Sequence, residues 1–206
     1  KIMKGRKWKP GYKYWGMTKQ EIKDLWAANG KEASDSGTIM HYDIECFYNE
    51  IYNENTSVEF QYFKNFHEKY KNVLIPYRTE WTVYDEYYKI SGSIDMTFIN
   101  DDGSISIYDW KRSKKIEKEN NFKKFAKFPN SDLDDNNYTH YCLQLNVYKF
   151  ILEKNYDIKI KDMYLVAFHP ENPIKNYEKI QVIDMQKRVK KLLDSHFQYL
   201  KKKSKN

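Results

Sequence analysis

The amino-acid sequence predicts an α/β fold in which helices flank a mixed central β-sheet. Helical periodicity dominates the first 70 residues, and segments rich in β-branched and aromatic residues then run from about residue 73 to residue 110. A helical segment that is apolar almost all round follows, and after it come two further strand patterns and a last amphipathic segment. Strands joined in part by a buried helix form a sheet with both parallel and antiparallel neighbours.

The composition is that of a folded protein with a surplus of basic residues. Hydrophobic residues make up 40% of the 206 residues and aromatic residues 17%, which excludes an intrinsically disordered chain. Lysine and arginine outnumber aspartate and glutamate by 36 to 29, a formal charge of +7. This charge suits a polyanionic partner such as a nucleic acid, but it also suits simple solubility.

The length favours one domain. We expect a basic, aromatic N-terminal arm over residues 1–17, a single domain over residues 18–200 and a lysine-rich tail over residues 201–206. The sequence has no internal repeats. It begins at Lys1 and not at methionine, so targeting cannot be deduced from it.

Capping signals and apolar spacing define the expected helices. Thr18 and Glu21 fit a capping box, and Asn29-Gly30 is a typical stop. A second helix is expected from residue 36 because apolar side chains recur at helical spacing, namely Met40, Ile44, Phe47 and Ile51. The full set of expected helices is residues 18–29, 36–53, 58–70, 138–154 and 184–200.

Five strands are expected, and the first three follow one another directly. Asn100-Asp-Asp-Gly103 is a hairpin signal between the second strand and the third. The strands are predicted at residues 73–85, 87–100, 104–110, 160–168 and 177–183. Between the third strand and the helix at 138–154 lie a basic stretch with phenylalanines, residues 111–127, and a polar loop, residues 129–137.

Two acidic residues and a lysine on the predicted hairpin are the first candidates for chemistry. Asp95 and Asp109 can lie side by side across the hairpin. Two such carboxylates repel one another unless a cation lies between them, and oxygen ligands favour Mg²⁺ or Mn²⁺. Lys111, two residues after Asp109, projects to the same face, where its ammonium could orient water and stabilise charge on a phosphate.

An acidic-x-Lys triplet is weak when taken alone. Glu21-Ile-Lys23 and Asp157-Ile-Lys159 match it equally well, on a predicted helix and at a solvated turn. The ordinary alternative for Asp109 and Lys111 is a strand-surface ion pair.

Four further polar residues strengthen the site, although each has an ordinary alternative. His41 could be a partly buried helix residue, and Glu80 could pair with Arg78. Gln144 and Tyr148 lie one turn apart on the buried helix, where a glutamine could simply bond to the backbone.

Taken in order, these residues resemble a known family. His41, Glu80, Gly92-x-x-Asp95, Asp109-x-Lys111 and Gln144-x-x-x-Tyr148 are similar to the RecB-type exonuclease branch of the PD-(D/E)XK nuclease superfamily, over about residues 36–150. The resemblance implies a restriction-endonuclease-like core and Mg²⁺- or Mn²⁺-dependent hydrolysis of phosphodiester bonds.

The resemblance also assigns roles. Its metal ligands would be His41, Asp95, Asp109 and the backbone carbonyl of Trp110. Lys111 would position the attacking water, Glu80 would lie in or near the metal shell, and Gln144 and Tyr148 would hold the nucleic acid or the site geometry. The candidates for nucleic-acid contact are Arg112, Ser113, Lys114, Lys115 and Tyr148, with Phe122 and Phe125 for base stacking. The alternative for that stretch is a solvated basic helix.

The expected partner is DNA, as ends or single strands, with no membrane. The resemblance also allows fusion to, or association with, a larger protein of DNA replication, recombination or repair. Cys46 and Cys142 are expected to be buried thiols of a reducing intracellular compartment, and two cysteines are too few for the iron–sulfur cluster of some branch members. Two alternatives stay open: a catalytically inactive nucleic-acid-binding module of the same fold, and a nuclease that acts on RNA.

Overall fold

A computed structural model describes residues 2–5, 7–120 and 122–203. The chain divides into two compact units, Lys1–Ile39 and Met40–Asn206. The first unit contains a short 3₁₀ helix η1 (Ile2–Lys4), an aromatic segment and the beginning of helix α1 (Lys19–Tyr48). In the aromatic segment the Trp8 ring lies 6.1 Å from that of Tyr12 and 5.7 Å from that of Trp15, measured between centroids.

Helix α1 corrects the prediction of two separate helices over residues 18–29 and 36–53. Its capping box is confirmed, since Thr18 N donates to Glu21 Oε2 (2.6 Å) and Glu21 N to Thr18 Oγ1 (3.2 Å). Gly30 does not stop the helix because strong helix formers surround it, and an interior glycine costs only about 1 kcal/mol. The helix ends earlier than expected, so Ile51 lies beyond it and is exposed instead of joining the buried stripe.

The second unit holds a five-stranded sheet whose spatial order is also its chain order. The elements after α1 are α2 (Val58–Tyr70), β1 (Ile75–Asp85), β2 (Ile90–Ile99), β3 (Ile105–Lys111), α3 (Asn137–Asn155), β4 (Ile160–Ala167), β5 (Glu178–Gln181) and α4 (Gln186–Lys203). Strands β1, β2 and β3 are antiparallel neighbours, β3 and β4 are parallel, and β4 and β5 are antiparallel. The predicted α/β class with a mixed sheet is therefore confirmed.

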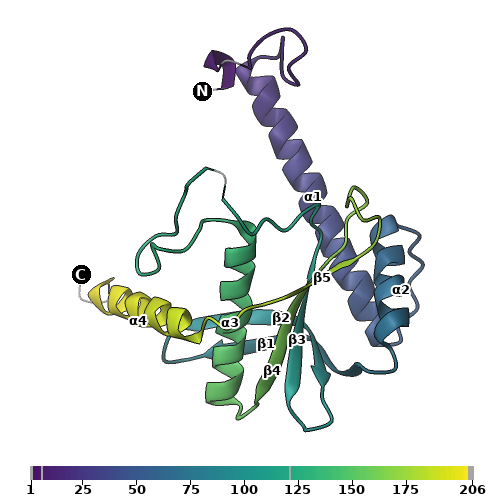
Figure 1. The fold of residues 1–206 in the computed structure, drawn as a ribbon, viewed down its shortest axis with the longest axis vertical. Helices are drawn as coiled ribbons and strands as arrows, with labels where there is room; N and C mark the ends of the chain where they lie inside the picture. Colours follow the sequence, from purple (N-terminus) through teal and green to yellow (C-terminus); the bar gives the residue numbers. More distant parts are fainter. Residues whose placement is uncertain (1, 6, 121, 204–206) are drawn as a thin grey trace. The chain divides into compact units, whose positions relative to one another are not determined.

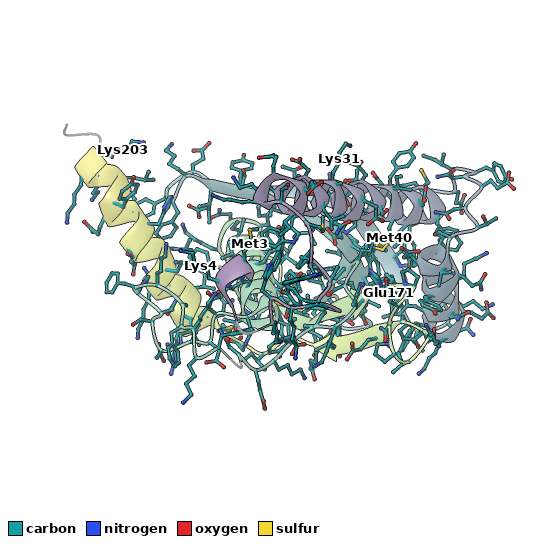
Figure 2. All side chains as sticks on the ribbon, turned by 90° about the horizontal axis from the view of Figure 1, so that it is seen from above. Met3, Lys4, Lys31, Met40, Glu171 and Lys203 are labelled. Atoms are coloured by element: carbon teal, nitrogen blue, oxygen red, sulfur yellow. The ribbon has the colours of Figure 1, made fainter. Side chains whose placement is uncertain are left out.

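Two apolar layers cover the two faces of the sheet (Figure 1). Helix α3 packs on one face through Leu145, Ile151 and neighbouring side chains, against Ile107 and Leu165 of the sheet. The other face is covered by α2 and the C-terminal part of α1, with Trp110 among the largest buried side chains there. Met40, labelled in Figure 2, is buried in this second layer. Cys46 and Cys142 are both buried free thiols, as expected.

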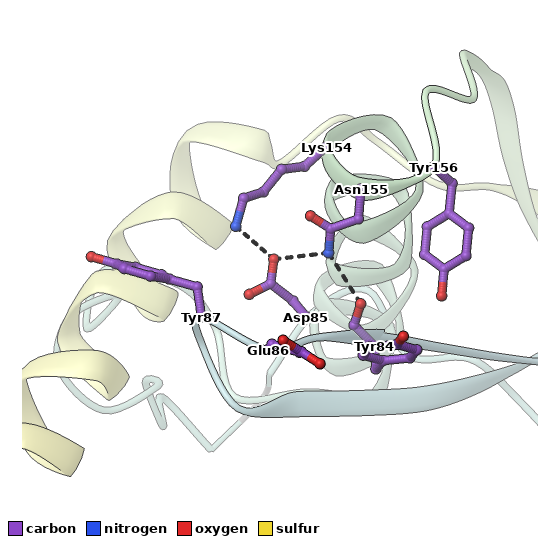
Figure 3. A pocket seen from close by; sticks show the side chains of 7 residues that line it. All are labelled: Tyr84, Asp85, Glu86, Tyr87, Lys154, Asn155 and Tyr156. Atoms are coloured by element: carbon purple, nitrogen blue, oxygen red, sulfur yellow. Dashed lines mark hydrogen bonds and ion pairs between the residues drawn. The ribbon is translucent and has the colours of Figure 1, made fainter.

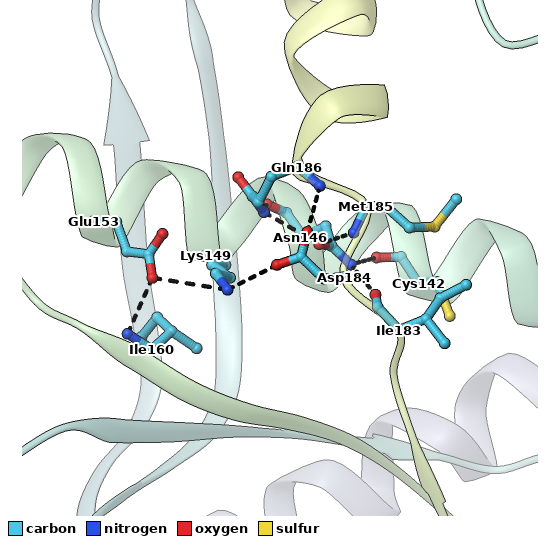
Figure 4. Close-up of polar contacts among 9 residues, drawn as sticks. All are labelled: Cys142, Asn146, Lys149, Glu153, Ile160, Ile183, Asp184, Met185 and Gln186. Carbon is cyan, nitrogen blue, oxygen red and sulfur yellow. Dashed lines mark hydrogen bonds and ion pairs between the residues drawn. The ribbon is translucent and has the colours of Figure 1, made fainter.

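Asn146, fully buried on α3, fixes the segment that leads into α4 (Figure 4). Its Nδ2 donates to the carbonyls of Cys142 (2.8 Å) and Ile183 (2.9 Å), and its Oδ1 accepts from Met185 N (2.7 Å). Buried polar groups need such partners. This asparagine therefore has a structural role.

A surface hollow of about 340 Å³ lies where the β1–β2 turn meets the end of α3 (Figure 3). Its one buried carboxylate, Asp85, accepts hydrogen bonds from Lys154 Nζ (2.6 Å), Asn155 Nδ2 (3.0 Å) and Tyr88 N (2.8 Å). Since every one of these contacts ties the turn to α3 or closes it, Asp85 is a structural residue.

Candidate metal centre and active site

The candidate site lies where strands β2 and β3 part. Their pairing begins at Ile99↔Ile105 and ends at Met96↔Tyr108, so the next residues are Asp95 on β2 and Asp109 on β3. Beyond this point β2 continues beside β1 alone, and β3 beside β4. The fork thus brings two carboxylates, fourteen positions apart in the chain, to one place in the fold.

Strand β1 is irregular at the same level. Glu80 has a φ of 40°, in the left-handed region, and it is left out of the pairing between Thr79↔Met96 and Trp81↔Ile94. Its counterpart on β2 is Asp95. The residues on either side of Asp95 pack on opposite faces of the sheet, Ile94 in the layer with α3 and Met96 in the other layer. Left-handed backbone in a residue other than glycine costs on the order of 1–3 kcal/mol and is concentrated at functional sites.

Three side chains from three elements form a candidate metal-binding group. His41 of α1, Glu80 of β1 and Asp95 of β2 each offer a ligand atom, and these atoms lie within 4.8 Å of one another. His41 Nδ1 is 3.6 Å from Asp95 Oδ2 and 4.0 Å from Glu80 Oε1. One nitrogen and two carboxylate oxygens suit a divalent cation.

Neighbouring donors hold the two carboxylates of this group. Ser93 Oγ donates to Glu80 Oε2 (2.8 Å), which leaves Oε1 toward His41. The backbone N–H of Trp110 donates to Asp95 Oδ2 (2.7 Å). Oriented carboxylates of this kind need less reorganisation to bind an ion.

Asp109 lies beside this group but is not one of its three members. Its carboxylate is 2% exposed, and Lys111 Nζ lies 2.5 Å from Oδ2. This lysine ammonium compensates the charge of the buried carboxylate, and the charge of Asp95 also acts on Asp109, so the two aspartates lie close to one another. The metal-ligand roles of Asp109 and of the Trp110 carbonyl stay predictions.

The charges at the site favour cation binding. Burial raises the pKa of Asp95 to about 7, and nearby Glu80 raises it further, whereas Lys111 and the Trp110 N–H lower it. Burial, together with the charge of Asp95, raises the pKa of Asp109 to about 7. Burial lowers the pKa of His41, so its imidazole is neutral and able to bind a metal. The donor set therefore fits a hard divalent cation.

Lys111 remains an ammonium in this environment. Burial lowers its pKa, but the carboxylates of Asp109 and Asp95 outweigh burial, and the net shift is upward. Its Nζ donates to Gln144 Oε1 at 3.4 Å, and Gln144 Nε2 donates to Tyr148 OH at 3.0 Å. The predicted pair on α3 is thus joined to the lysine by a chain of hydrogen bonds.

Tyr141 was missed in the sequence. Its ring centroid lies 4.7 Å from Lys111 Nζ, on the side of α3 that also carries Gln144. The signal was present, because residues three and seven positions apart share a helix face and Tyr141 stands at those spacings from Gln144 and Tyr148. Ser93, the donor to Glu80, gave no comparable sequence signal.

Gly92 leaves room for Tyr148, and its substitution makes a sharp test. A Cβ built at Gly92 would lie 2.5 Å from Tyr148 Cε1 and 3.0 Å from its hydroxyl oxygen. Gly92→Ala is therefore expected to displace the Tyr148 ring and to break its contact with Gln144. We expect Gly92→Ala to lower the melting temperature, and Gly92→Ala combined with Tyr148→Ala should fold better than Gly92→Ala alone, as thermal melting will measure. Additive stability effects of the two changes would contradict the contact.

The residues expected to touch phosphate follow β3: Arg112, Ser113, Lys114 and Lys115. Arg112 Nε forms an ion pair of 2.7 Å with Glu59 of α2, and both side chains are largely buried. Lys114 Nζ pairs with Glu171 (2.5 Å), and Lys115 Nζ pairs with Glu117 (3.1 Å). Ser113 Oγ donates to the Lys115 carbonyl. None of these described contacts involves the ligand group, and the role in phosphate binding stays a prediction.

Comparisons with known proteins leave the family open. No protein-family model matches the chain, and no curated protein matches it. Among solved structures, it is similar to a candidate exonuclease from Eubacterium rectale at 12% identity and a TM-score of 0.37, over 73% of this chain and 69% of that chain. A likeness at that TM-score is too distant to support a function.

Fold and site together define a class: an α/β protein with a mixed sheet and a His–Glu–Asp group able to hold a divalent cation. Among the described helices, none combines the length and the apolar character that crossing a bilayer requires.

Proposed function

We propose that this protein is a metal-dependent nuclease that hydrolyses phosphodiester bonds of DNA, acting as an exonuclease on ends or single strands. The observation that carries the proposal is the Lys111 ammonium beside Asp109, next to the ligand group of His41, Glu80 and Asp95. A fixed positive charge next to a cation site is what phosphoryl chemistry requires. The resemblance over residues 36–150 gives the same function.

The side chains would divide the work as follows. His41, Glu80 and Asp95, with Asp109, would hold the cation; when bound, Mg²⁺ or Mn²⁺ supplies Lewis-acid polarisation of a phosphate oxygen and acidifies water. Lys111 offers a donor and a positive charge where the phosphate gains negative charge. Gln144 fixes the lysine through its Oε1. Tyr148, bonded to Gln144, completes this arrangement.

Preference for ends is supported by the Gln144–Tyr148 motif, which the family resemblance links to end processing. The decisive assay compares end-labelled linear DNA with closed circular DNA in Mg²⁺ or Mn²⁺. We expect mononucleotides or short products from the linear form, an intact circle, and no product in the presence of a chelator. Nicking of the circle at a comparable rate would make the enzyme an endonuclease.

The same assay separates the alternatives. A chain that binds DNA with strong salt dependence but never cuts would be an inactive binding module. Faster cutting of a matched RNA strand would make RNA the substrate.

A further inference from the structure

The loop between β3 and α3, residues 112–136, carries exposed aromatic side chains that the proposed chemistry does not use. Phe122 is 84% exposed, Phe125 57% and Phe128 82%. Large apolar side chains in exposed positions lose the stabilisation of burial, so a group of them on one loop indicates an interaction surface. We call the exposed rings at 122, 125 and 128 the phenylalanine group.

Hydrogen bonds organise the backbone of this loop, and its described residues, 112–120 and 122–136, do not form the basic helix considered for this stretch. Ala126 N donates to the Leu133 carbonyl (2.8 Å), Asp135 N donates to the Lys124 carbonyl (3.0 Å), and Phe125 bridges to Asp134. Asn120 Nδ2 bonds to the carbonyls of Lys124 and Asp135. The rings are thus presented by a hydrogen-bonded loop, which lowers the entropy cost of binding.

Unpaired positive charge alternates with the rings. Lys123, Lys124 and Lys127 are exposed, and none has a carboxylate within 4.0 Å in the described parts of the chain. Of the acidic residues nearby, Asp132 is neutralised by its ion pair with Arg188. The loop therefore combines free ammonium groups with flat apolar surfaces.

The loop is continuous with the candidate site through α3. Tyr141 lies under Lys111, and Tyr138, one turn earlier on α3, carries the Lys118 ammonium 5.2 Å from its ring centroid. Tyr138 N also lies 3.4 Å from the Glu117 carbonyl. Figure 1 shows the loop extending from the N-terminal end of α3.

We propose that this loop binds single-stranded DNA, with unpaired bases stacked on the phenylalanine group and phosphates on Lys123, Lys124 and Lys127. Rings that alternate with lysines match a single strand, whose bases expose their faces, and not a duplex, whose faces are already stacked. The proposal deepens the proposed function, on which it rests, by assigning a single strand as the polymer that approaches Lys111.

The test measures binding without cleavage, so it is independent of catalysis. Fluorescence anisotropy in a chelator follows a labelled twelve-nucleotide oligothymidine and a hairpin duplex of equal charge. Phe122→Ala combined with Phe128→Ala is expected to weaken oligothymidine binding by roughly 30-fold or more and duplex binding less than about twofold. Phe122→Tyr with Phe128→Tyr should restore the affinity, since tyrosine also stacks.

Controls decide between specific and general effects. Tyr52→Ala removes an equally exposed ring, 88% exposed and outside this loop, and should leave binding unchanged. Neutralising the three lysines to glutamine should lower the salt slope by about 0.7 for each phosphate that is no longer neutralised. Unchanged oligothymidine affinity in the double alanine variant, or an equal loss for the duplex, would overturn the proposal.

An anionic lipid surface could also bind exposed phenylalanine rings and lysine ammonium groups, so lipid binding is tested in parallel. If the double alanine variant lost binding to phosphatidylserine vesicles yet kept oligothymidine affinity, the loop would be a membrane contact and the proposal would be wrong. If the wild type bound oligothymidine through the loop but cut no DNA, the proposed nuclease activity would be wrong and the proposed single-strand binding by the loop would be supported.

Discussion

Asp109→Asn and Lys111→Gln should each reduce metal-dependent cleavage of end-labelled DNA by on the order of 10²–10³-fold. Asparagine keeps the shape of Asp109 but removes the charge that a cation would meet, and glutamine keeps a donor at residue 111 without the ammonium. Both groups lie inside the site, with the lysine Nζ 2.5 Å from the aspartate Oδ2. The measurement is single-turnover cleavage at saturating protein and saturating Mn²⁺, so that neither weakened DNA binding nor weakened metal binding hides the chemical step.

Matched controls exist in the same chain. Asp157-Ile-Lys159 repeats the acidic-x-Lys triplet at an exposed turn before β4. Asp157→Asn and Lys159→Gln should leave cleavage within about twofold of the wild type, because exposed charges away from a site contribute little. DNA binding should remain close to wild type in all four variants, and the melting temperature should remain close to wild type in Asp157→Asn and Lys159→Gln. An Asp109→Asn or Lys111→Gln protein that cuts at the wild-type rate would show that the assigned residue takes no part in catalysis.

The strand-forming residues and the turn signals in the sequence were enough to predict the five strands of the sheet. In each strand, the intrinsic preference of the residues for extended structure agrees with their place in the fold. The hairpin at residues 100–103 formed with Gly103 at a φ of 77°. The early stop at Gly30 failed for the opposite reason. A glycine ends a helix only when the chain beyond it leaves the helical path, and the neighbours of Gly30 favour continuation.

The candidate site was predictable in its members but not in its geometry. Spacing placed Asp109 and Lys111 on one face, and the structure agrees. Whether β2 and β3 stay paired or part at Asp95 depends on tertiary competition between β1 and β4, which one sequence does not reveal. The left-handed backbone of Glu80 is likewise imposed by its surroundings, since local preference disfavours it.

The buried ion pair between Arg112 and Glu59 is a second feature that the sequence alone could not predict. In the sequence, Arg112 follows the Asp109-Trp-Lys111 triplet and opens a basic stretch, so phosphate contact was the natural expectation. Its partner lies 53 positions earlier, on α2, and no local pattern joins the two. Long-range ion pairs of this kind can be recognised only in three dimensions.

Cation affinity should rise steeply with pH between 6 and 8. Asp95 and Asp109 both have a pKa of about 7 without a cation, so protons and the cation compete for them. Two groups that must both lose a proton give about a hundredfold weaker binding at pH 6 than at pH 8. Lys111 stays charged because its pKa is raised, so it does not add to this slope. Mn²⁺ titrations followed by calorimetry at pH 6, 7 and 8 measure it.

The same shifts set the stability of the cation-free protein. A carboxyl whose pKa is higher in the folded chain than in the unfolded chain stabilises the fold below the unfolded value of 3.8, and this contribution is lost as pH rises through about 7. The cation replaces the lost protons, so the gain in melting temperature on adding Mn²⁺ should be larger at pH 8 than at pH 6. Asp109→Asn should reduce the affinity slope from two protons to one. A slope that is flat in the wild type would mean that these carboxylates do not bind the cation.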